Sequence, residues 1–453
     1  MQLDRLIAAV APRTVLHERP AEIADLAYDT RSTGANALFF CVAGGHADGH
    51  ELAGRAIAAG ASALVVERPL DHDVPQLVVE SVRRAMPPAA TTFFGDPSRE
   101  LPVAGVTGTN GKTTTAFLLA AILGAAERRP GLLTNIERRV GGASRELGLN
   151  TPEAIDLQRL LREMLDAGDG ACVMEATSIA GAQGRLEGTR FAVLVFTNLT
   201  QDHLDYHGTM EEYYAAKRAL FEQAERAVVN VGDPWGARLA RELPDARTFT
   251  PDDDLGDVEL QLRGRFNRAN ALGAIWAARE LGVAEDAIRA GVASVAGVPG
   301  RFETIEEGQP FAVVVDYAHT PDSLENVLRL ARDLVDGRVI VVFGAGGDRD
   351  RDKRPHMGRA AVAGSDLALL TTDNPRSEDP ATIAAEVAAG APEARLVLDR
   401  REAIEAALED ARPGDVVVIA GKGAETVQER VDGTIPFDDR EMAREALRRM
   451  VRA

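Results

Sequence analysis

The chain has 453 residues, and its 51 Lys and Arg against 70 Asp and Glu give a formal net charge of −19. This excess of negative charge argues against nucleic acid or an anionic membrane as a partner, because proteins that bind those surfaces normally present a basic face. Hydrophobic residues make up 45% of the chain and charged residues 27%, which is typical of a globular protein. At roughly 100–200 residues per domain, the length indicates two to four domains.

Cysteine usage and hydropathy indicate the compartment. Cys41 and Cys172 lie far apart without a CxxC pattern, so we expect neither a disulfide framework nor a zinc site. The longest apolar stretch, residues 116–126, is shorter than the roughly 18 residues that a membrane span needs. The apolar run at residues 6–11 is too short for the core of a signal peptide. We therefore expect a cytoplasmic protein.

Three segments of α/β character divide the chain, with limits at residues 1–98, 99–299 and 300–453. Turn-rich stretches separate them, and the middle segment begins with a strand, a glycine-rich loop and a helix. Strand-like apolar runs recur in all three and lie at residues 37–42, 63–66, 76–79, 171–174, 191–196, 227–231, 311–315, 338–343, 367–370 and 416–420. Strands that alternate with helix-length segments predict mainly parallel sheets, and the third segment is expected to be doubly wound.

The glycine-rich loop has the chemistry of a nucleoside triphosphate site. Residues 103–114 form a short strand, a turn and a Lys-Thr pair that opens an apolar helix. Backbone N–H groups at such a turn bind phosphate oxygens, Lys112 neutralises their charge and the hydroxyl of Thr113 can bind Mg²⁺. The strict G-x4-G-K-[ST] spacing fails by one position because the first glycine is Gly105. The alternative is a plain glycine-rich turn.

Acidic and histidine side chains follow two of the predicted strands. Glu175 comes after the run at 171–174, and Asn198, Asp202 and His203 come after the run at 191–196. Ligands of α/β sheets collect at these strand ends, and a glutamate with a neutral imidazole there can hold a divalent cation. Each residue alone is more often a helix cap or a solvated loop residue.

Lys217 falls inside the apolar stripe of a predicted helix at residues 210–221. Spacing alone favours a lysine that extends its ammonium from this face to water. The alternative is a desolvated lysine with a lowered pKa, whose neutral amine takes up CO₂ and becomes a carbamate that binds metal.

Charged groups also follow the strands of the third segment, at Asp316, at residues 346–354, at 373–376 and at 421–425. Such a cluster suits a zwitterionic substrate, since arginine pairs with a carboxylate in bidentate fashion while Asp, Asn and Glu hold an ammonium. A dinucleotide site is a weak alternative, because Arg349 occupies the sixth position of the G-x-G-x-x-G pattern. Simple solvated loops are the other alternative.

The chain resembles the Mur ligase family through motifs that run along its whole length. These are Asp29-Thr30-Arg31, His46-Ala47-Asp48-Gly49, Gly108-Thr109-Asn110-Gly111-Lys112-Thr113-Thr114, Thr151-Pro152-Glu153, Asp202-His203-Leu204-Asp205-Tyr206-His207-Gly208, Ala216-Lys217, Asn267 with Asn270, Gly300-Arg301-Phe302-Glu303, Asp316-Tyr317-Ala318-His319-Thr320-Pro321, Gly347-Asp348-Arg349-Asp350, Asp373-Asn374-Pro375-Arg376 and Gly421-Lys422-Gly423. The resemblance implies a three-domain α/β architecture, with an N-terminal UDP-binding domain, a central ATP-binding domain built on a P-loop NTPase-like parallel sheet, and a Rossmann-like C-terminal domain that binds an amino acid.

The resemblance also assigns site residues and cofactors. It implies ATP and Mg²⁺ as cofactors and a catalytic set of Lys112, Glu175, His203 and a carbamylated Lys217. Thr113, Glu175, His203 and Lys217 are the implied metal ligands. The implied ATP contacts are Gly108, Thr109, Asn110, Gly111, Lys112, Thr113, Thr114, Asn267, Asn270, Arg301, Asp316 and Lys353. The implied substrate contacts are Thr30, His46, Asn150, Thr151, Thr177, Ser178, Arg185, Arg349, Asp373, Asn374, Arg376, Gly421 and Glu425.

The activity that the resemblance implies is an ATP-dependent, ADP-forming amide ligation through an acyl phosphate. The expected partners are UDP-MurNAc-L-Ala-D-Glu and meso-diaminopimelate, and the expected state is a monomer. Arg376 is the residue that would pair with the second carboxylate of meso-diaminopimelate. Two family histidines are replaced, by Ile179 and Ala424. Addition of L-lysine or another amino acid, a modified acceptor, and a P-loop regulatory NTPase without ligase activity are the alternatives.

Overall fold

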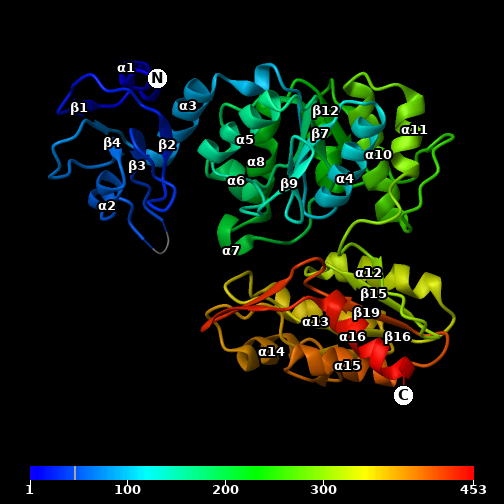
Figure 1. The fold of residues 1–453 in the computed structure, drawn as a ribbon. Helices are drawn as coiled ribbons and strands as arrows, with labels where there is room; N and C mark the ends of the chain where they lie inside the picture. The colour runs from blue at the N-terminus through cyan, green and yellow to red at the C-terminus, as the bar shows by residue number, and fades with distance from the viewer. Residues whose placement is uncertain (45–46, 453) are drawn as a thin grey trace.

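The computed structural model describes residues 1–44 and 47–452. Its strands form three separate α/β sheets and one hairpin, and the three sheets follow one another along the chain (Figure 1). The α/β class is confirmed. No helix in the described part of the chain is both long and apolar enough to span a membrane.

The first sheet has the strand order β1-β5-β4-β3-β2, and only β1 is antiparallel to its neighbour. Its elements are α1 (Leu3–Val10), β1 (Thr14–Leu16), β2 (Asp25–Ala27), β3 (Ala37–Phe40), α2 (Ala53–Ala58), β4 (Ala61–Val66), β5 (Gln76–Val78), α3 (Val82–Phe94) and the 3₁₀ turn η1 (Pro97–Arg99). The helix α3 ends at Gly95, whose positive φ of 77° suits glycine as the residue that terminates a helix.

The second sheet has the order β13-β12-β11-β6-β10-β7-β8-β9, and only the pairs β7–β8 and β8–β9 are antiparallel. Its elements are β6 (Val103–Thr107), α4 (Lys112–Ala125), β7 (Pro130–Leu133), β8 (Arg138–Val140), β9 (Ala143–Arg145), α5 (Ala154–Asp166), β10 (Ala171–Glu175), α6 (Ser178–Ala182), β11 (Phe191–Phe196), α7 (Leu204–His207), α8 (Met210–Ala219), η2 (Leu220–Gln223), β12 (Ala227–Asn230), α9 (Pro234–Glu242), β13 (Arg247–Phe249), α10 (Arg265–Glu280) and α11 (Glu285–Ala293).

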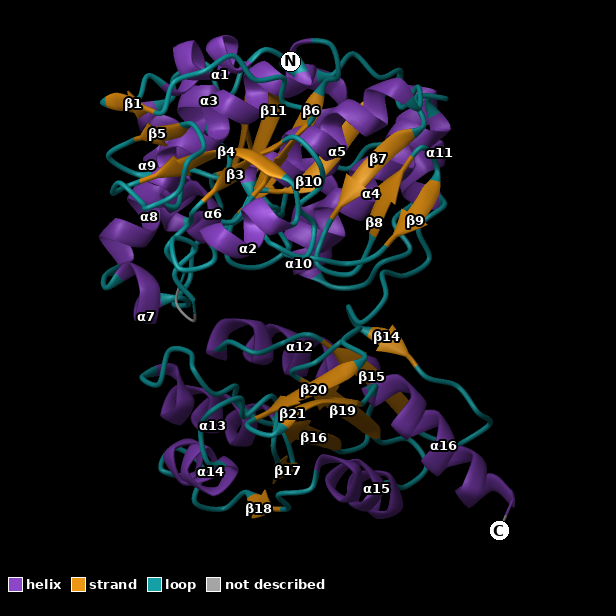
Figure 2. Ribbon diagram, turned by 60° about the vertical axis from the view of Figure 1, so that its left-hand side comes forward, coloured by secondary structure: helices purple, strands orange, loops and turns teal. Residues whose placement is uncertain are grey.

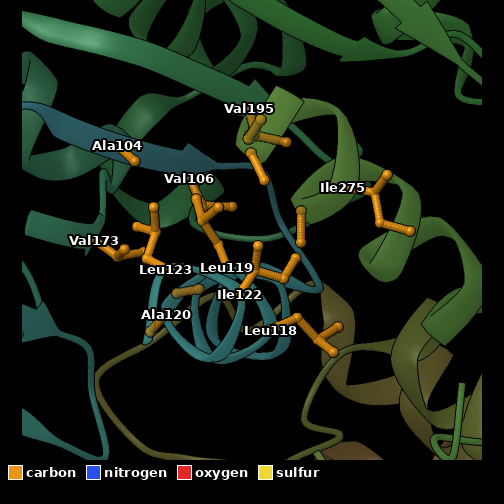
Figure 3. Close-up of a cluster of buried hydrophobic side chains, with 14 of the residues drawn as sticks. Ala104, Val106, Leu118, Leu119, Ala120, Ile122, Leu123, Val173, Val195 and Ile275 are labelled. Atoms are coloured by element: carbon orange, nitrogen blue, oxygen red, sulfur yellow. The ribbon is translucent and has the colours of Figure 1, made fainter. Parts of the chain in front are cut away.

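Helix α4 is the most deeply packed helix of this middle region. It is apolar along most of its length, and Leu119, Ile122 and Leu123 are fully buried. They lie beneath side chains of the central strands, including Val106 and Val195 (Figure 3). A helix that is apolar on most of its faces is held in the core, so the first turn of α4 and the loop before it have a fixed position against β6.

The third sheet has the order β14-β15-β19-β16-β17-β18 and is parallel except for β14. Its elements, with the hairpin β20–β21, are β14 (Glu303–Thr304), β15 (Ala312–Asp316), α12 (Pro321–Leu334), β16 (Val339–Phe343), α13 (Lys353–Gly364), β17 (Leu367–Leu370), α14 (Pro380–Ala388), β18 (Arg395–Leu396), α15 (Arg400–Asp410), β19 (Val416–Ala420), β20 (Val427–Arg430), β21 (Gly433–Pro436) and α16 (Asp439–Arg452). Figures 1 and 2 show α12 on the side of this sheet that faces the middle sheet and its helices.

The strands predicted at 191–196, 367–370 and 416–420 have those bounds in the structure, and the others differ by one or two residues at one or both ends. Glu175 and Asp316 are the last residues of β10 and β15, and Pro321 opens α12, as their positions in the sequence indicate. The domain limits at 98/99 and 299/300 stay a prediction, although each sheet falls within one of the three segments.

A buried ion pair joins the last helix to the third sheet. Arg400 donates to both carboxylate oxygens of Asp439 at 2.8 and 2.6 Å and to the carbonyl of Ala420 at 2.8 Å, and neither charged side chain is exposed. Removing one member of such a pair leaves the other charge buried without a partner, which costs more than the pair itself contributes.

We therefore expect Arg400→Ala to destabilise the C-terminal region by about 3–5 kcal/mol. The neighbouring Arg401 makes an exposed ion pair with Glu445 on the same two helices, so Arg401→Ala is the matched control and is expected to cost below about 1 kcal/mol. Thermal and denaturant unfolding of both variants measures the difference. Equal losses in the two variants would show that burial of the Arg400 pair is unimportant.

Candidate active site

The phosphate loop connects β6 to α4 and presents its carbonyl groups to two lysines. Lys112 donates to the carbonyls of Gly108 and Thr109 at 3.0 and 2.7 Å, and Lys217 donates to the same Gly108 carbonyl at 2.8 Å. Gly108 has a φ of 149°, and a Cβ at this position would lie 1.9 Å from the hydroxyl oxygen of Thr197. Glycine is therefore required here, and the close approach brings the loop against the end of β11.

Lys217 does not reach water. Its side chain is 1% exposed, and its ammonium lies 4.7 Å from the centre of the Tyr213 ring. The snorkelling interpretation is therefore wrong, because the stripe that carries Lys217 packs against the phosphate loop rather than lying at the surface. Burial first, and then the positive charge of Lys112, hold the pKa of Lys217 well below its usual range.

Lys112 has a similar environment. Burial lowers the pKa of Lys112, and the negative charges of Glu175 and Asp202 oppose that effect. Two ammonium groups that share one carbonyl oxygen repel each other, and a low-dielectric surrounding strengthens that repulsion. The loop therefore favours a bound anion, or the loss of a proton from one lysine.

The hydroxyl of Thr113 joins two parts of the chain that are far apart in sequence. It donates to Glu175 at 2.8 Å and accepts from Arg301 at 2.8 Å. The side-chain oxygen of Asn135 lies 3.2 Å from the same hydroxyl, and Asn150 donates to the second oxygen of Glu175 at 3.0 Å. The carboxyl ends of β6, β7 and β10 thus bring oxygen donors together around the first turn of α4.

A second group surrounds Asp202. Lys353 donates to Asp202 at 3.1 Å, and the imidazoles of His203 and His319 lie 3.4 and 3.8 Å from its other oxygen. Burial raises the pKa of Asp202, but the charges of Lys353 and the two histidines outweigh it and hold that pKa well below its usual range. Burial also lowers the pKa of His203 to about 4, so this imidazole is neutral at pH 7.

The remaining residues around the phosphate loop lie where the middle and third domains meet. Asn110 donates to Asp322 of α12 at 2.9 Å, and Arg301 lies 4.4 Å from the ring of Tyr317. Asp316 accepts from the backbone N–H groups of Phe302 and Ala318, both at 2.7 Å, and burial raises its pKa. The strand end of β15 is thereby attached to the segment that carries Arg301.

The other predicted nucleotide contacts pack around the loop. Asn270 donates to Asn267 at 3.1 Å, and its side-chain oxygen lies 2.2 Å from where a Cβ of Gly111 would stand. Thr109 bonds with the hydroxyl of Tyr213 at 3.1 Å, and Thr114 is buried in the first turn of α4. These residues fix the loop from the α10 and α8 sides.

The predicted acceptor contacts lie around the end of β10. Thr151 donates to the carbonyl of Glu175 at 2.8 Å and lies 3.0 Å from the hydroxyl of Thr177, while Arg185 donates to the carbonyl of Thr151 at 3.2 Å. Ser178 bonds to the ring of His207 at 3.0 Å. The structure thus brings these residues of the acceptor set together.

Thr30 and His46 are the predicted substrate contacts of the first domain. Thr30 lies in the turn after β2, beside the ion pair of Asp29 and Arg31. The position of His46 lies outside the described residues. Both therefore stay predictions.

The amino-acid cluster lies at the carboxyl ends of β17 and β19. Asn374 donates to Glu425 at 2.8 Å and accepts from Lys422 at 3.0 Å. Asp373 is buried beside Gly421, and one of its oxygens has no hydrogen-bond partner in the described part of the chain. Burial raises the pKa of Asp373, but Arg400 and Lys422 outweigh this effect and lower it.

Arg376 and Arg349 complete that cluster. Arg376 donates to Glu429 at 2.6 Å and to the carbonyl of Gly347 at 2.8 Å. Arg349 is exposed and donates only to the carbonyl of its neighbour Asp348 among the described residues. Both guanidinium groups are therefore positioned at the surface of the cluster, where a carboxylate can reach them.

The sequence patterns did not indicate Asn135 or Asp322 as site residues. Asn135 follows β7, one strand away from Glu175, and its place after a short apolar run was the available signal. Asp322 follows Pro321 in the first turn of α12, where an acid reads as an ordinary helix-start residue. Only because α12 approaches the phosphate loop does Asp322 also accept a hydrogen bond from Asn110.

Three Mur ligase family models match successive parts of the chain. Residues 22–92 match the Mur ligase family catalytic domain, residues 106–251 the Mur ligase middle domain, and residues 300–423 the Mur ligase glutamate ligase domain. The UDP-N-acetylmuramoyl-L-alanyl-D-glutamate–2,6-diaminopimelate ligases of Solibacter usitatus and Geobacillus kaustophilus are each 43% identical to the chain. The alignments cover 99% of the chain and 98% and 99% of those relatives.

Solved structures agree. A UDP-N-acetylmuramoyl-L-alanyl-D-glutamate–2,6-diaminopimelate ligase structure is 32% identical, with a TM-score of 0.63 over 95% of both chains. MurF from Acinetobacter baumannii is 20% identical, with a TM-score of 0.69 over 99% of this chain and 98% of that one, and shows the shared fold. The resemblance and the three-domain architecture are confirmed, and the chain belongs to the Mur ligase family.

Proposed function

We propose that this ATP-dependent amide ligase joins meso-diaminopimelate to UDP-MurNAc-L-Ala-D-Glu in the synthesis of a peptidoglycan precursor. Relatives named for this reaction match almost the whole chain, which supports the choice of substrates. The structural observation that carries the proposal is the contact of Thr113 with both Glu175 and Arg301. It brings the phosphate loop, the acceptor-side strand end and the third domain to one point.

The reaction runs in two steps. The terminal carboxylate of the acceptor attacks the γ-phosphorus of ATP and releases ADP, which leaves an acyl phosphate. The amine of the amino acid then attacks the acyl carbon and releases phosphate. Lys112 and Arg301 stabilise the charge on the transferred phosphoryl group, and contacts between domains such as Asn110–Asp322 keep water from the acyl phosphate.

Magnesium fits the oxygen donors at the start of α4. The hydroxyl of Thr113 lies within hydrogen-bond distance of both the Glu175 carboxylate and the Asn135 amide oxygen, and Mg²⁺ prefers such hard oxygen ligands. Bound there, Mg²⁺ would neutralise negative charge on the triphosphate. Among residues 1–44 and 47–452, no three His, Cys, Asp or Glu side chains are grouped to hold a metal. A second metal ion, bound by His203, would therefore need a further anionic ligand.

We propose that a carbamate on Lys217 is that anion. Burial lowers the pKa of this amine, which favours the neutral form whose electron pair attacks CO₂. Carbamylation replaces a cation beside Lys112 with an anion, which removes the repulsion between the two lysines at the Gly108 carbonyl. The neutral imidazole of His203 supplies a further ligand.

Cellular setting and assembly form part of the proposal. Cys41 and Cys172 are both free and buried, as is common in a reducing compartment. We place the enzyme in the cytoplasm, as a monomer with one complete site per chain.

The test of the proposed function is ADP release with each substrate omitted in turn. We expect release only when UDP-MurNAc-L-Ala-D-Glu and the amino acid are both present, with meso-diaminopimelate preferred over L-lysine and L-ornithine. Equal ATP hydrolysis without either substrate would instead support a regulatory NTPase. A preference for L-lysine would contradict the assignment of the amino acid alone.

Lys217→Ala tests the carbamate. We expect kcat to fall by about 100-fold or more, since loss of a metal-binding anion removes charge stabilisation at the phosphoryl group. Added formate or acetate should restore part of the activity by occupying the space of the carbamate. Arg218→Ala is the matched control, because Arg218 is the next residue but pairs with Glu222 and Glu242 at the surface. No recovery with any short carboxylate would contradict the metal-anion role.

Arg376→Ala tests recognition of the second carboxylate. A charge-assisted hydrogen bond contributes roughly 1.5–3 kcal/mol, so kcat/KM for meso-diaminopimelate should fall about 10- to 100-fold. The rate with L-lysine, which lacks that carboxylate, should change little. Arg351→Ala is the control, because Arg351 pairs with Glu378 at the surface. An equal loss for both amino acids would assign Arg376 a structural role only.

A further inference from the structure

The carboxylate of Glu153 lies between arginines of the first and middle domains. One nitrogen of Arg83, on α3, donates to both of its oxygens at 2.8 and 2.9 Å. Nε of Arg185 lies 3.2 Å from the nearer oxygen. The side chains are 29%, 10% and 14% exposed for Arg83, Glu153 and Arg185. The cluster is thus mostly removed from water and has one positive charge in excess.

Arg185 is the residue of this cluster that has a hydrogen-bond donor left unused. Its Nε is buried and has no hydrogen-bond partner among the described residues, because the N–H does not point at Glu153. Burial lowers the pKa of Arg185 most, the negative charge of Glu153 opposes this effect, and the positive charge of Arg83 adds a smaller lowering. A buried donor without a partner is costly, so this guanidinium is arranged for an anion that comes from outside the protein.

We propose that Arg83, Glu153 and Arg185 form an oxyanion-binding cluster in which Arg83 is a positioning residue. Arg83 holds the Glu153 carboxylate at both oxygens and so keeps it from turning further and forming a hydrogen bond with Arg185, whose Nε lies 3.2 Å away without one. Arg185 then binds a carboxylate or phosphate oxygen of the acceptor. This inference rests on the proposed function, because the anion belongs to the acceptor substrate.

The backbone around Glu153 explains why only its side chain would move. Glu153 precedes the first turn of α5 and its side chain makes no cap bond to that helix. Two residues earlier, Thr151 is fixed to the carbonyl of Glu175 at 2.8 Å. Without Arg83, the Glu153 carboxylate can therefore turn onto Arg185 while its backbone stays in place. It would then compete with the substrate anion for the guanidinium.

Arg83→Ala is the first variant. We expect the KM for UDP-MurNAc-L-Ala-D-Glu to rise about 10-fold or more, with the KM for ATP and kcat little changed. The double variant Arg83→Ala/Glu153→Gln should bring that KM back to within about threefold of wild type, since glutamine has no charge to neutralise Arg185. Arg83→Lys, which keeps the charge but not the bidentate geometry, should show a smaller rise in the same direction.

Arg159→Ala is the matched control. Arg159 joins the same two domains through Asp25, at 2.8 and 3.0 Å, and through the carbonyl of Leu26, but does not touch Glu153. We expect it to leave the acceptor KM within about twofold of wild type. An equal rise in Arg83→Ala and Arg159→Ala, or no recovery in the double variant, would overturn the inference and leave only an ion pair that holds two domains together.

The source of the anion is resolved with MurNAc-L-Ala-D-Glu, which lacks the uridine diphosphate. If the effect of Arg83→Ala on KM persists, Arg185 binds a carboxylate, and if it disappears, Arg185 binds a phosphate. Both outcomes support the cluster. Wild-type enzyme without acceptor-dependent ADP release would contradict the proposed function itself, whereas normal wild-type turnover with an unchanged KM in Arg83→Ala overturns this inference alone.

Discussion

The carbonyl oxygen of Gly108 accepts hydrogen bonds from both Lys112 and Lys217, and the arrangement of the catalytic centre depends on this shared acceptor. One oxygen cannot compensate two buried ammonium groups. A bound phosphate, the carbamate proposed above or a neighbouring carboxylate would meet this deficit, as would the loss of a proton from one lysine. The position of α4 in the core makes that deficit permanent, because the loop cannot relax away from the lysines without disturbing the packing of Leu119 and Ile122.

The same device occurs at the boundary between the first and middle domains. Arg83 and Arg185 share Glu153 much as Lys112 and Lys217 share Gly108, although Glu153 is charged and leaves one positive charge over. The chain as a whole has a net charge of −19, so these positive centres are local exceptions to its overall charge. An excess of negative charge disfavours extended polyanions, whereas a few desolvated cations, whose fields water does not screen, can bind small anions.

Much of the fold was accessible from the sequence, because parallel strands buried on both faces appear as continuous apolar runs. Helix α3 was not, since Pro87 and Pro88 lie within it and proline argues against a helix interior. Packing of its buried face against the first sheet, with Val82, Met86 and Ala89 in the core, outweighs that local cost. The exposed hairpin β8–β9 was also missed, as its strands are three residues long and mostly polar.

The sequence predicted which types of residue lie at the candidate site, but not the electrostatic environment of each one. Strand ends marked Glu175 and Asp316 because topology alone places each of them at the carboxyl edge of its own sheet. The sequence could not predict the burial of Lys217. The same apolar stripe is expected whether this lysine reaches solvent or packs against a phosphate loop. Arg83 and Glu153 lie 70 positions apart, and only the docking of two domains makes them a pair.

Docking between the middle and third domains determines when the catalytic centre is complete. Asp202 holds Lys353 from the third domain, and Thr113 holds Arg301, so two cations from that domain reach the phosphate loop side through contacts that a substrate phosphate can also make. Under the proposed function, an arriving triphosphate would compete with Asp202 and Thr113 for the same two cations. Because the cations can exchange a protein oxygen for a phosphate oxygen at similar geometry, nucleotide binding would not need to break the domain contact. It would replace a direct contact with one that passes through the substrate, and so would couple domain closure to the presence of ATP.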